Sequence, residues 1–200
     1  MVSKIFSLLG SVLLAAALIL WGYFQWEDYR AGKQSSQHLA ALVEQIPSPD
    51  EGALMLDIPE LEKTEVPIDV QMKEVTIYGH AYIGYLEIPS LKLELPVMSE
   101  WSYAKLDVAP CRYFGTMKGK DLVLMAHNFY QHFGKINTLE IGSEITFSDM
   151  DGTVYRYKVA AHEILKPSAT EEMIASGYPL TLFTCTTDSK SRVVVRCEMA

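Results

Sequence analysis

The chain has 200 residues, 49% of them hydrophobic, which is enough for one ordinary globular domain with an extension but not for two large domains. The formal charge is -8 and the 17 Lys and Arg residues are scattered, so there is no basic stripe for a phosphate backbone and we expect no nucleic-acid partner. The three cysteines are too few for a disulfide scaffold, and their separations fit no zinc pattern.

The N-terminal segment is apolar and long enough to cross a bilayer. Residues 5–26 carry no charge, and about 20 apolar residues at a rise of about 1.5 Å match the hydrocarbon thickness. We predict a transmembrane helix rather than a cleaved signal peptide, because the small residues at 15–17 lie inside the apolar run. Aromatic rings crowd its C-terminal end, where a membrane interface is expected. Lys4 precedes the span, so residues 1–4 are predicted to be cytoplasmic and the domain extracellular in a single-pass protein.

Two connecting segments follow the predicted span. Residues 27–46 carry Leu39, Leu42, Val43 and Ile46 at helical spacing before Pro47, which predicts a helical stalk. Residues 47–80 are acidic, contain several prolines and have no sustained period, which predicts an irregular linker.

From residue 81 to 200 the sequence is typical of a mainly β domain. Short β-branched and aromatic runs alternate with Gly, Pro, Asp and Asn. The runs predict strands at 82–88, 91–97, 122–126, 144–147, 154–164, 180–185 and 192–198, with a DMDGT hairpin turn between the fourth and the fifth. Seven or eight such strands fit either a closed barrel or a sandwich. Short helices are predicted at 102–106 and at 170–176, the second with a Thr170 N-cap.

Cys185 is the first candidate for chemistry. It ends the apolar run LTLF and precedes a polar stretch, so the thiol is expected at the rim of a strand, although a small buried residue is the more common role of a cysteine. Arg192 opens the next strand after a short loop, so its guanidinium can lie beside the thiol. There it would favour the thiolate and donate hydrogen bonds to an oxyanion; the alternative is a surface arginine.

A thiol nucleophile also needs an imidazole partner. His127 is the best placed histidine because it closes the predicted strand at 122–126, and His132 in the following loop is its rival. His38, His80 and His162 are expected to be structural or solvated.

The last predicted strand carries two further residues that need an interpretation. Arg196 lies on the same face of the strand as Arg192 and could contribute to the site or compete with it. Cys197 lies on the opposite face with two valines, which indicates a buried core thiol. A disulfide between Cys197 and Cys111 remains possible at this point, because the sequence does not give the distance between the two thiols.

Several segments together resemble one enzyme family. TLFTC at 181–185 resembles the TLxTC signature around the nucleophile of sortases, which attach surface proteins to Gram-positive cell walls. MAHN at 125–128 looks like the segment bearing the sortase histidine, and SRVVVRC at 191–197 is similar to the strand that opens with its arginine. YIGYLEIPSLKLELPV resembles the first two barrel strands, so the likeness covers roughly residues 81–200, the predicted catalytic domain.

The resemblance implies a closed eight-stranded β-barrel and a cysteine transpeptidase. Cys185 would attack the Thr–Gly bond of an LPXTG-like sorting signal, Arg192 would stabilise the oxyanion, and His127 would act as acid and base. The acceptor would be an amine of a peptidoglycan precursor or a pilin lysine. Thr184 and Asn128 would help to bind substrate, and Thr184 could instead shape the site.

Some alternatives stay open at this point. The chain resembles compact class B or class D sortases. A membrane-anchored cysteine peptidase that hydrolyses to water, or a non-catalytic β-barrel binding module, would share most of these features. No cofactor is expected. Glu144, Asp149 and Asp151 suggest a calcium site, but the sequence DMDG is more typical of an ordinary turn.

Overall fold

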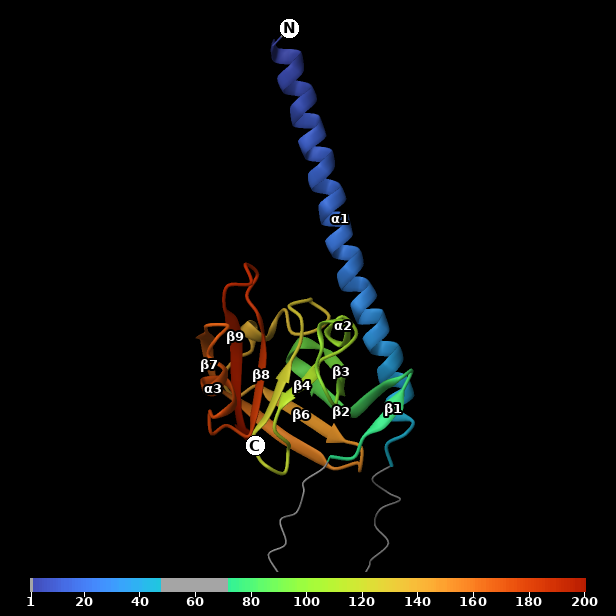
Figure 1. The fold of residues 1–200 in the computed structure, drawn as a ribbon, viewed down its shortest axis with the longest axis vertical. Coiled ribbons are helices and arrows are strands. Elements are labelled where there is room, and N and C mark those ends of the chain that lie inside the picture. Colours follow the sequence, from blue (N-terminus) through green and yellow to red (C-terminus); the bar gives the residue numbers. More distant parts are fainter. Residues whose placement is uncertain (1, 48–71) are drawn as a thin grey trace, which may run out of the picture.

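The computed structural model describes residues 2–47 and 72–200. A single long helix, α1 (Val2–Val43), projects from a β domain, and its C-terminal half lies along one side of that domain (Figure 1). By length and composition α1 could cross a membrane. The predicted span and stalk are thus one uninterrupted helix, which ends a few residues before Pro47.

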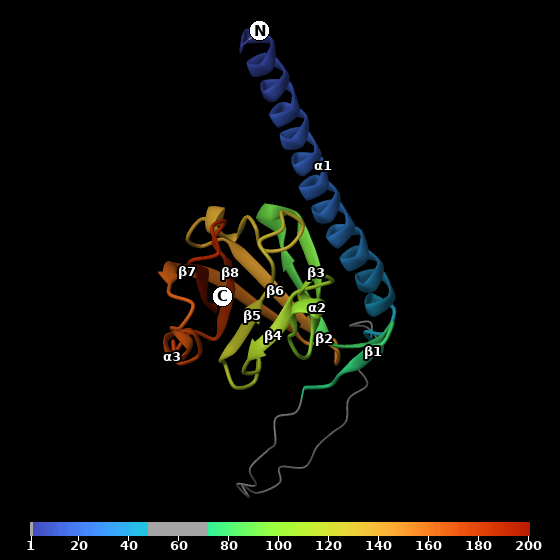
Figure 2. The same ribbon diagram turned by 45° about the horizontal axis from the view of Figure 1, so that its top comes forward.

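The strands form one sheet that closes on itself. Its order is β1-β2-β3-β4-β5-β8-β9-β7-β6, and β2 also pairs with β6, so β2 to β9 make a closed eight-stranded barrel (Figure 2). Most neighbours are antiparallel, while β3–β4 and β5–β8 are parallel. The strands are β1 (Val75–Ile77), β2 (His80–Ile88), β3 (Leu93–Met98), β4 (Cys111–Phe114), β5 (Leu122–Met125), β6 (Glu144–Asp149), β7 (Val154–Leu165), β8 (Leu180–Cys185) and β9 (Arg192–Met199).

Gly84 permits the closure of the barrel. It has a positive φ of 146° and lies opposite Asp149 in the β2–β6 pairing. A Cβ at this position would lie 2.1 Å from the carbonyl oxygen of Ser148, which no side chain can tolerate. The two strands can therefore approach each other only because residue 84 has no side chain.

The barrel confirms the seven predicted strands and adds two that were not predicted. β4 is only four residues long and has no clear alternation. β1 lies in the segment predicted as linker; the rest of that prediction, from 48 to 71, falls outside the described residues. The third strand starts later than expected, because 89–91 form a 3-10 turn, η1 (Pro89–Leu91), and Lys92 is left-handed with φ 55°.

The short helices lie outside the barrel. α2 (Tyr103–Leu106) is capped by the Ser102 hydroxyl, which accepts from the backbone N–H of Lys105 at 3.2 Å. α3 (Thr170–Ile174) begins at the predicted residue and ends two residues earlier than predicted, and Ala169 is the N-cap, so the prediction of a Thr170 cap was wrong. A second 3-10 turn, η2 (Ile136–Thr138), follows β5.

Apolar side chains are buried in three places. One cluster fills the barrel, with residues such as Phe147, Leu182 and Val195. A second lies between the barrel and the C-terminal part of α1, around Leu42 and Met98. The third lies between α3 and the outer wall of the barrel: it consists of Val123, Met173, Phe183 and Val194. Alternate residues of β8 and β9 therefore face the interior or an outer surface that α3 partly covers.

Candidate active site

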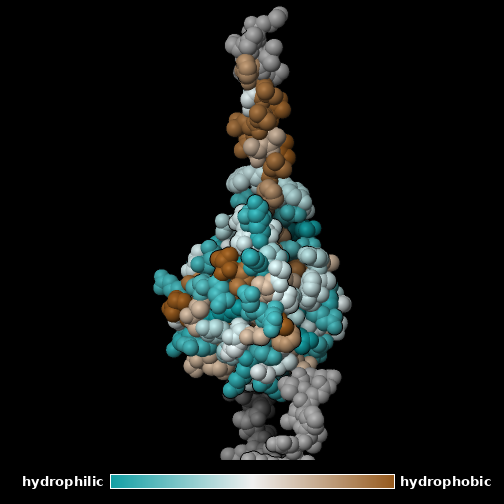
Figure 3. All heavy atoms as spheres, turned by 60° about the vertical axis from the view of Figure 1, so that its left-hand side comes forward, coloured by the Kyte–Doolittle hydropathy of each residue, from teal (hydrophilic) through white to brown (hydrophobic). Residues whose placement is uncertain are grey.

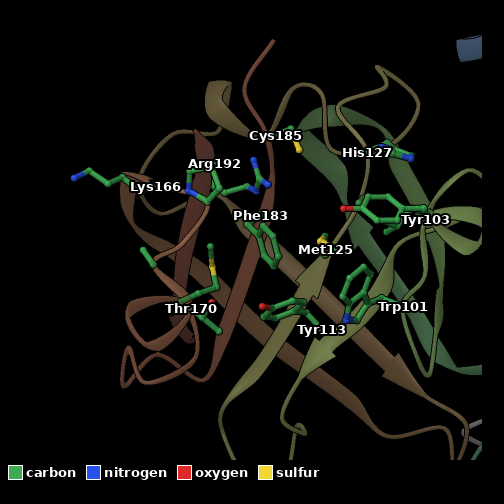
Figure 4. A pocket seen from close by; sticks show the side chains of 15 residues that line it. Trp101, Tyr103, Tyr113, Met125, His127, Lys166, Thr170, Phe183, Cys185 and Arg192 are labelled. Atoms are coloured by element: carbon green, nitrogen blue, oxygen red, sulfur yellow. The ribbon is translucent and has the colours of Figure 1, made fainter. Parts of the chain in front are cut away.

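Cys185 lies at the C-terminal end of β8, where the wall of the barrel opens to solvent. Leu180, Leu182 and Thr184 face the interior, so Cys185 and Phe183 project from the outer face. Cys185 is half-buried, and its sulfur points into a pocket on this face (Figure 4). The prediction of a rim thiol at a strand end is confirmed.

Arg192 lies directly across from the thiol. It pairs with Cys185 in the β8–β9 register, and its guanidinium reaches into the same pocket (Figure 4). Its described hydrogen bonds are to backbone carbonyls, from Nη1 to Ser191 at 3.1 Å and to Ser189 at 3.5 Å. Further N–H groups of the Arg192 guanidinium are thus available to donate hydrogen bonds to a negatively charged oxygen.

Arg196, in contrast to Arg192, is buried and its guanidinium is hydrogen-bonded on all sides. It is 1% exposed, and Nε and Nη2 donate to Oε2 of Glu163 at 3.0 and 2.8 Å. Its other N–H groups donate to Thr181 Oγ1 and to the carbonyls of Glu172 and Met173, at 2.9 to 3.1 Å. The guanidinium therefore ties α3 to the barrel wall, and it has no free face toward the thiol.

His127 follows β5 and borders the same pocket as Cys185 and Arg192. Its Nε2 lies 3.3 Å from Oδ1 of Asp107, and its ring is 5.0 Å from the ring of Phe129. A carboxylate at this distance forms an ion pair with the protonated imidazole and orients its ring. Sequence reasoning missed Asp107, since only the fold brings the end of α2 next to the end of β5.

His132, the rival of His127, is fully buried. Neither ring nitrogen has a hydrogen-bond partner in the described residues. Burial, and to a smaller extent His127, lower the pKa of His132 to about 4, against a weaker opposing effect of the Ala31 and Val108 carbonyls. A neutral ring without access to solvent or to the pocket is a packing residue.

The two residues predicted to bind substrate lie on the other side of Cys185. Thr184 is 3% exposed, and its hydroxyl donates to the carbonyl of Ala126 at 2.8 Å. That bond joins β8 to the residue before His127. Asn128 and Thr184 line a second, polar hollow that also reaches Cys185 and includes Asn137.

The other two cysteines are buried and free. Cys197 faces the barrel interior, as predicted, whereas Cys111 lies in the cluster beneath α1. The possible bridge between them is thus ruled out, because the wall of the barrel separates them. Burial raises the pKa of each thiol to about 12, so both are protonated at neutral pH.

The pocket around Cys185 is largely apolar and aromatic. Tyr113 packs edge-on against Phe183 at 5.2 Å between ring centroids, and Trp101 lies 6.0 Å from Tyr113. Tyr103 remains 77% exposed at the edge. Sequence reasoning missed this aromatic lining, although Trp101 and Tyr103, two aromatic residues at the start of a predicted short helix, were a signal. Its other lining residues include Leu106, Met125, Lys166, Pro167, Thr170 and Met173.

The DMDGT segment is the predicted hairpin turn. Oδ1 of Asp149 accepts from the N–H groups of Asp151 and Thr153 at 3.0 and 2.9 Å, and Asp151 forms an ion pair with Lys73 at 3.2 Å. Among residues 2–47 and 72–200, no three His, Cys, Asp or Glu side chains are grouped to share a metal ion. Asp149 and Asp151 thus stabilise the turn and its contact with Lys73, while Glu144 is the first residue of β6 and lies outside the turn.

Comparison with known proteins identifies the family. The Sortase domain model matches residues 86–200, and the chain is 24% identical over 204 residues to sortase A of Bacillus anthracis, covering 98% of this chain and 95% of that protein. The chain therefore belongs to the sortase family, whose members are cysteine transpeptidases.

Solved sortase structures share the fold. Sortase A from Corynebacterium diphtheriae superposes with a TM-score of 0.54 at 21% identity, over 60% of this chain and 61% of that one. Sortase C1 from Streptococcus agalactiae gives a TM-score of 0.55 at 23% identity, over 62% and 70%. Sortase E1 from Streptomyces coelicolor, solved with a tripeptide in the active site, gives 0.53 at 25% identity, over 60% and 88%.

Proposed function

We propose that this chain is a transpeptidase that cleaves an LPXTG-like sorting signal between Thr and Gly and transfers the acyl group to an amine. The observation that carries the proposal is the single pocket shared by Cys185, His127 and Arg192. Arg192 has N–H groups to spare at the thiol, while Arg196 has none, which favours Arg192 as the oxyanion partner.

The first half-reaction forms a thioester. The Cys185 thiolate attacks the carbonyl carbon of the Thr residue, and the negative charge that develops on the oxygen is stabilised by the Arg192 guanidinium. Collapse of the tetrahedral species breaks the C–N bond, and His127 donates a proton to the departing glycine amine. Asp107 holds the His127 ring at the edge of the pocket while the proton moves.

The second half-reaction releases the product. An amine of a peptidoglycan precursor or a pilin lysine attacks the thioester carbonyl, and His127 accepts its proton. The new amide forms as the Cys185 sulfur leaves as thiolate, so the enzyme is restored without a cofactor. The thioester can be reached from two sides, because the polar hollow with Asn128 and Thr184 meets the apolar pocket at Cys185.

The composition of the pocket supports an apolar peptide as acyl donor. Trp101, Tyr113 and Phe183 offer ring faces on which Leu and Pro side chains of an extended peptide can pack. The sortase E1 structure, which was solved with a tripeptide in its active site, supports a peptide as ligand. The apolar helix α1 would hold the enzyme in the membrane with its N-terminus inside and the catalytic domain outside.

Intact-mass analysis tests the reaction. The detergent-solubilised chain is incubated with LPXTG peptides, with and without an added amine, beside its Cys185→Ala variant. A mass gain equal to the peptide acylated through Thr, absent in the variant and lost on adding the amine, is expected. Release of the free acid at the same rate with and without amine would instead show a hydrolase, and an unreactive Cys185 would indicate a binding module.

A further inference from the structure

We propose that the end of the barrel that carries Cys185 lies against the headgroup layer of the bilayer that holds α1. The partner surface is the bilayer itself, and the peptides acted on are those held at the membrane surface. This inference rests on the proposed membrane anchoring and adds the orientation of the active site, which α1 alone would not fix.

The first observation is that α1 is rigidly joined to the domain. The helix runs without a break from the apolar segment to Val43. Ala31, Ser35 and Leu42 on its C-terminal half are 2%, 1% and 0% exposed, so this half is packed against the domain. His38 adds a hydrogen bond to the Tyr82 hydroxyl on β2. Because a helix is stiff along its axis, the packed half determines how the domain sits beneath the span.

The second observation is the position along α1 at which the domain first contacts the helix. Oδ1 of Asp28 accepts from the backbone N–H of Gln131 at 3.2 Å, and a Cβ added at Gly32 would lie 2.7 Å from Gln131 Cγ. Gln131 belongs to the loop that follows His127. Trp26, the last residue of the predicted span, precedes Asp28 by two steps of about 1.5 Å, or about 3 Å along the helix axis. The loop next to His127 therefore meets α1 where the apolar segment ends.

The views of the molecule agree with this position of the domain, next to the end of the apolar segment of α1. The end of the barrel with the β8–β9 loop points in the same direction as the N-terminus of α1 (Figure 1). The apolar band of α1 ends directly above the globular domain (Figure 3). Cys185, which ends β8 at the start of that loop, is thus on the membrane side of the barrel.

The surface of this rim suits a headgroup layer. Tyr130 is 60% exposed and Ile141 is 63% exposed, and Lys135 Nζ lies 4.8 Å from the centroid of the Tyr130 ring. Ile141 precedes β6, whose first residues lie beside the C-terminal end of β2 at the same end of the barrel. Exposed aromatic and apolar groups, with a cation beside them, are typical of side chains at a membrane interface.

Quenching measures the orientation without any need for activity. In the Cys185→Ala background, in which the two remaining thiols are buried, Ile141→Cys carries a fluorophore in liposomes containing headgroup-spin-labelled lipid. Val154→Cys, at the opposite end of the barrel and 45% exposed, is the matched control. We expect several-fold stronger quenching at position 141. Equal quenching at both positions, or stronger quenching at 154, would overturn the proposal.

Activity gives a second, separate test. Seven polar helix-forming residues inserted after Trp26 would lift the domain by about 10 Å and rotate it by only about 20°. Rates are compared for one peptide in soluble form and tethered to lipid by a short spacer. We expect the tethered-to-soluble ratio to fall on the order of a hundredfold and to recover when the spacer is lengthened by about 10 Å. An unchanged ratio would contradict the proposed orientation, whereas a native chain inactive on the soluble peptide would contradict the proposed reaction.

Discussion

The two arginines of β9 lie on one face, yet the structure predicts opposite consequences for their removal. Arg196→Ala removes five hydrogen bonds from a guanidinium that is 1% exposed. Breaking a buried ion pair by removing one partner costs about 3–5 kcal/mol. Glu163 is 39% exposed and can rehydrate, so we expect the lower end, about 3 kcal/mol.

Arg192→Ala should leave the fold nearly unchanged, because its described hydrogen bonds are two contacts to loop carbonyls. We expect a change of less than about 1 kcal/mol in the free energy of unfolding. Loss of an oxyanion partner lowers kcat about 10²–10³-fold, or about 2.7–4 kcal/mol of transition-state stabilisation. The activity loss and the stability loss should therefore separate between the two variants.

Both quantities can be measured on the full chain in detergent. Urea titration followed by pulse proteolysis should show the Arg196→Ala midpoint lowered by about 1.5 M, for a slope of about 2 kcal/mol/M, and Arg192→Ala near the parent. The rate of acyl-enzyme formation at low urea should fall about 10²–10³-fold in Arg192→Ala and be largely retained in Arg196→Ala. A stable Arg196→Ala that fails to acylate, beside an active Arg192→Ala, would refute the assignment.

Three further predictions concern the site and its surroundings. Thr184→Val removes the hydrogen bond between β8 and the end of β5 and should cost about 1–3 kcal/mol by urea titration, with Thr184→Ser close to the parent. At pH 8, iodoacetamide should modify Cys185 in the native chain and reach Cys111 and Cys197 only after unfolding, as peptide mass mapping would show; equal labelling would contradict their burial. The buried, neutral His132 has its pKa lowered to about 4, so the unfolded chain binds more protons between pH 6.5 and 4, and stability measured by urea titration should fall by about 3 kcal/mol as pH drops through that window. Most of this fall should be lost in His132→Phe, while the smaller part due to His38, whose pKa is also lowered by burial, remains.

Much of the structure of this protein could be predicted from local patterns in the sequence. The uncharged run at 5–26 and the helical spacing after it predicted α1, because these signals depend only on neighbours along the chain. β-branched and aromatic runs between turn residues predicted seven strands, and alternation along the last of them predicted that Cys197 is buried in the core. The position of Cys185 at a strand end predicted a rim thiol, and the short loop to Arg192 predicted their pairing.

Other features depended on contacts between distant segments. β4 has too few residues to show a period, and it is stabilised by pairing with β5 and, through Met98, with β3. Alternation placed both arginines of β9 on one face, but only packing against α3 and Glu163 decided that Arg196 is structural and Arg192 is available. Asp107 meets His127, and Asp28 of α1 meets the loop after it, only because the closed barrel brings separate segments to one rim. Sequence patterns thus determine which residues face the same way, while tertiary packing determines which of them are already bonded and which remain free to act.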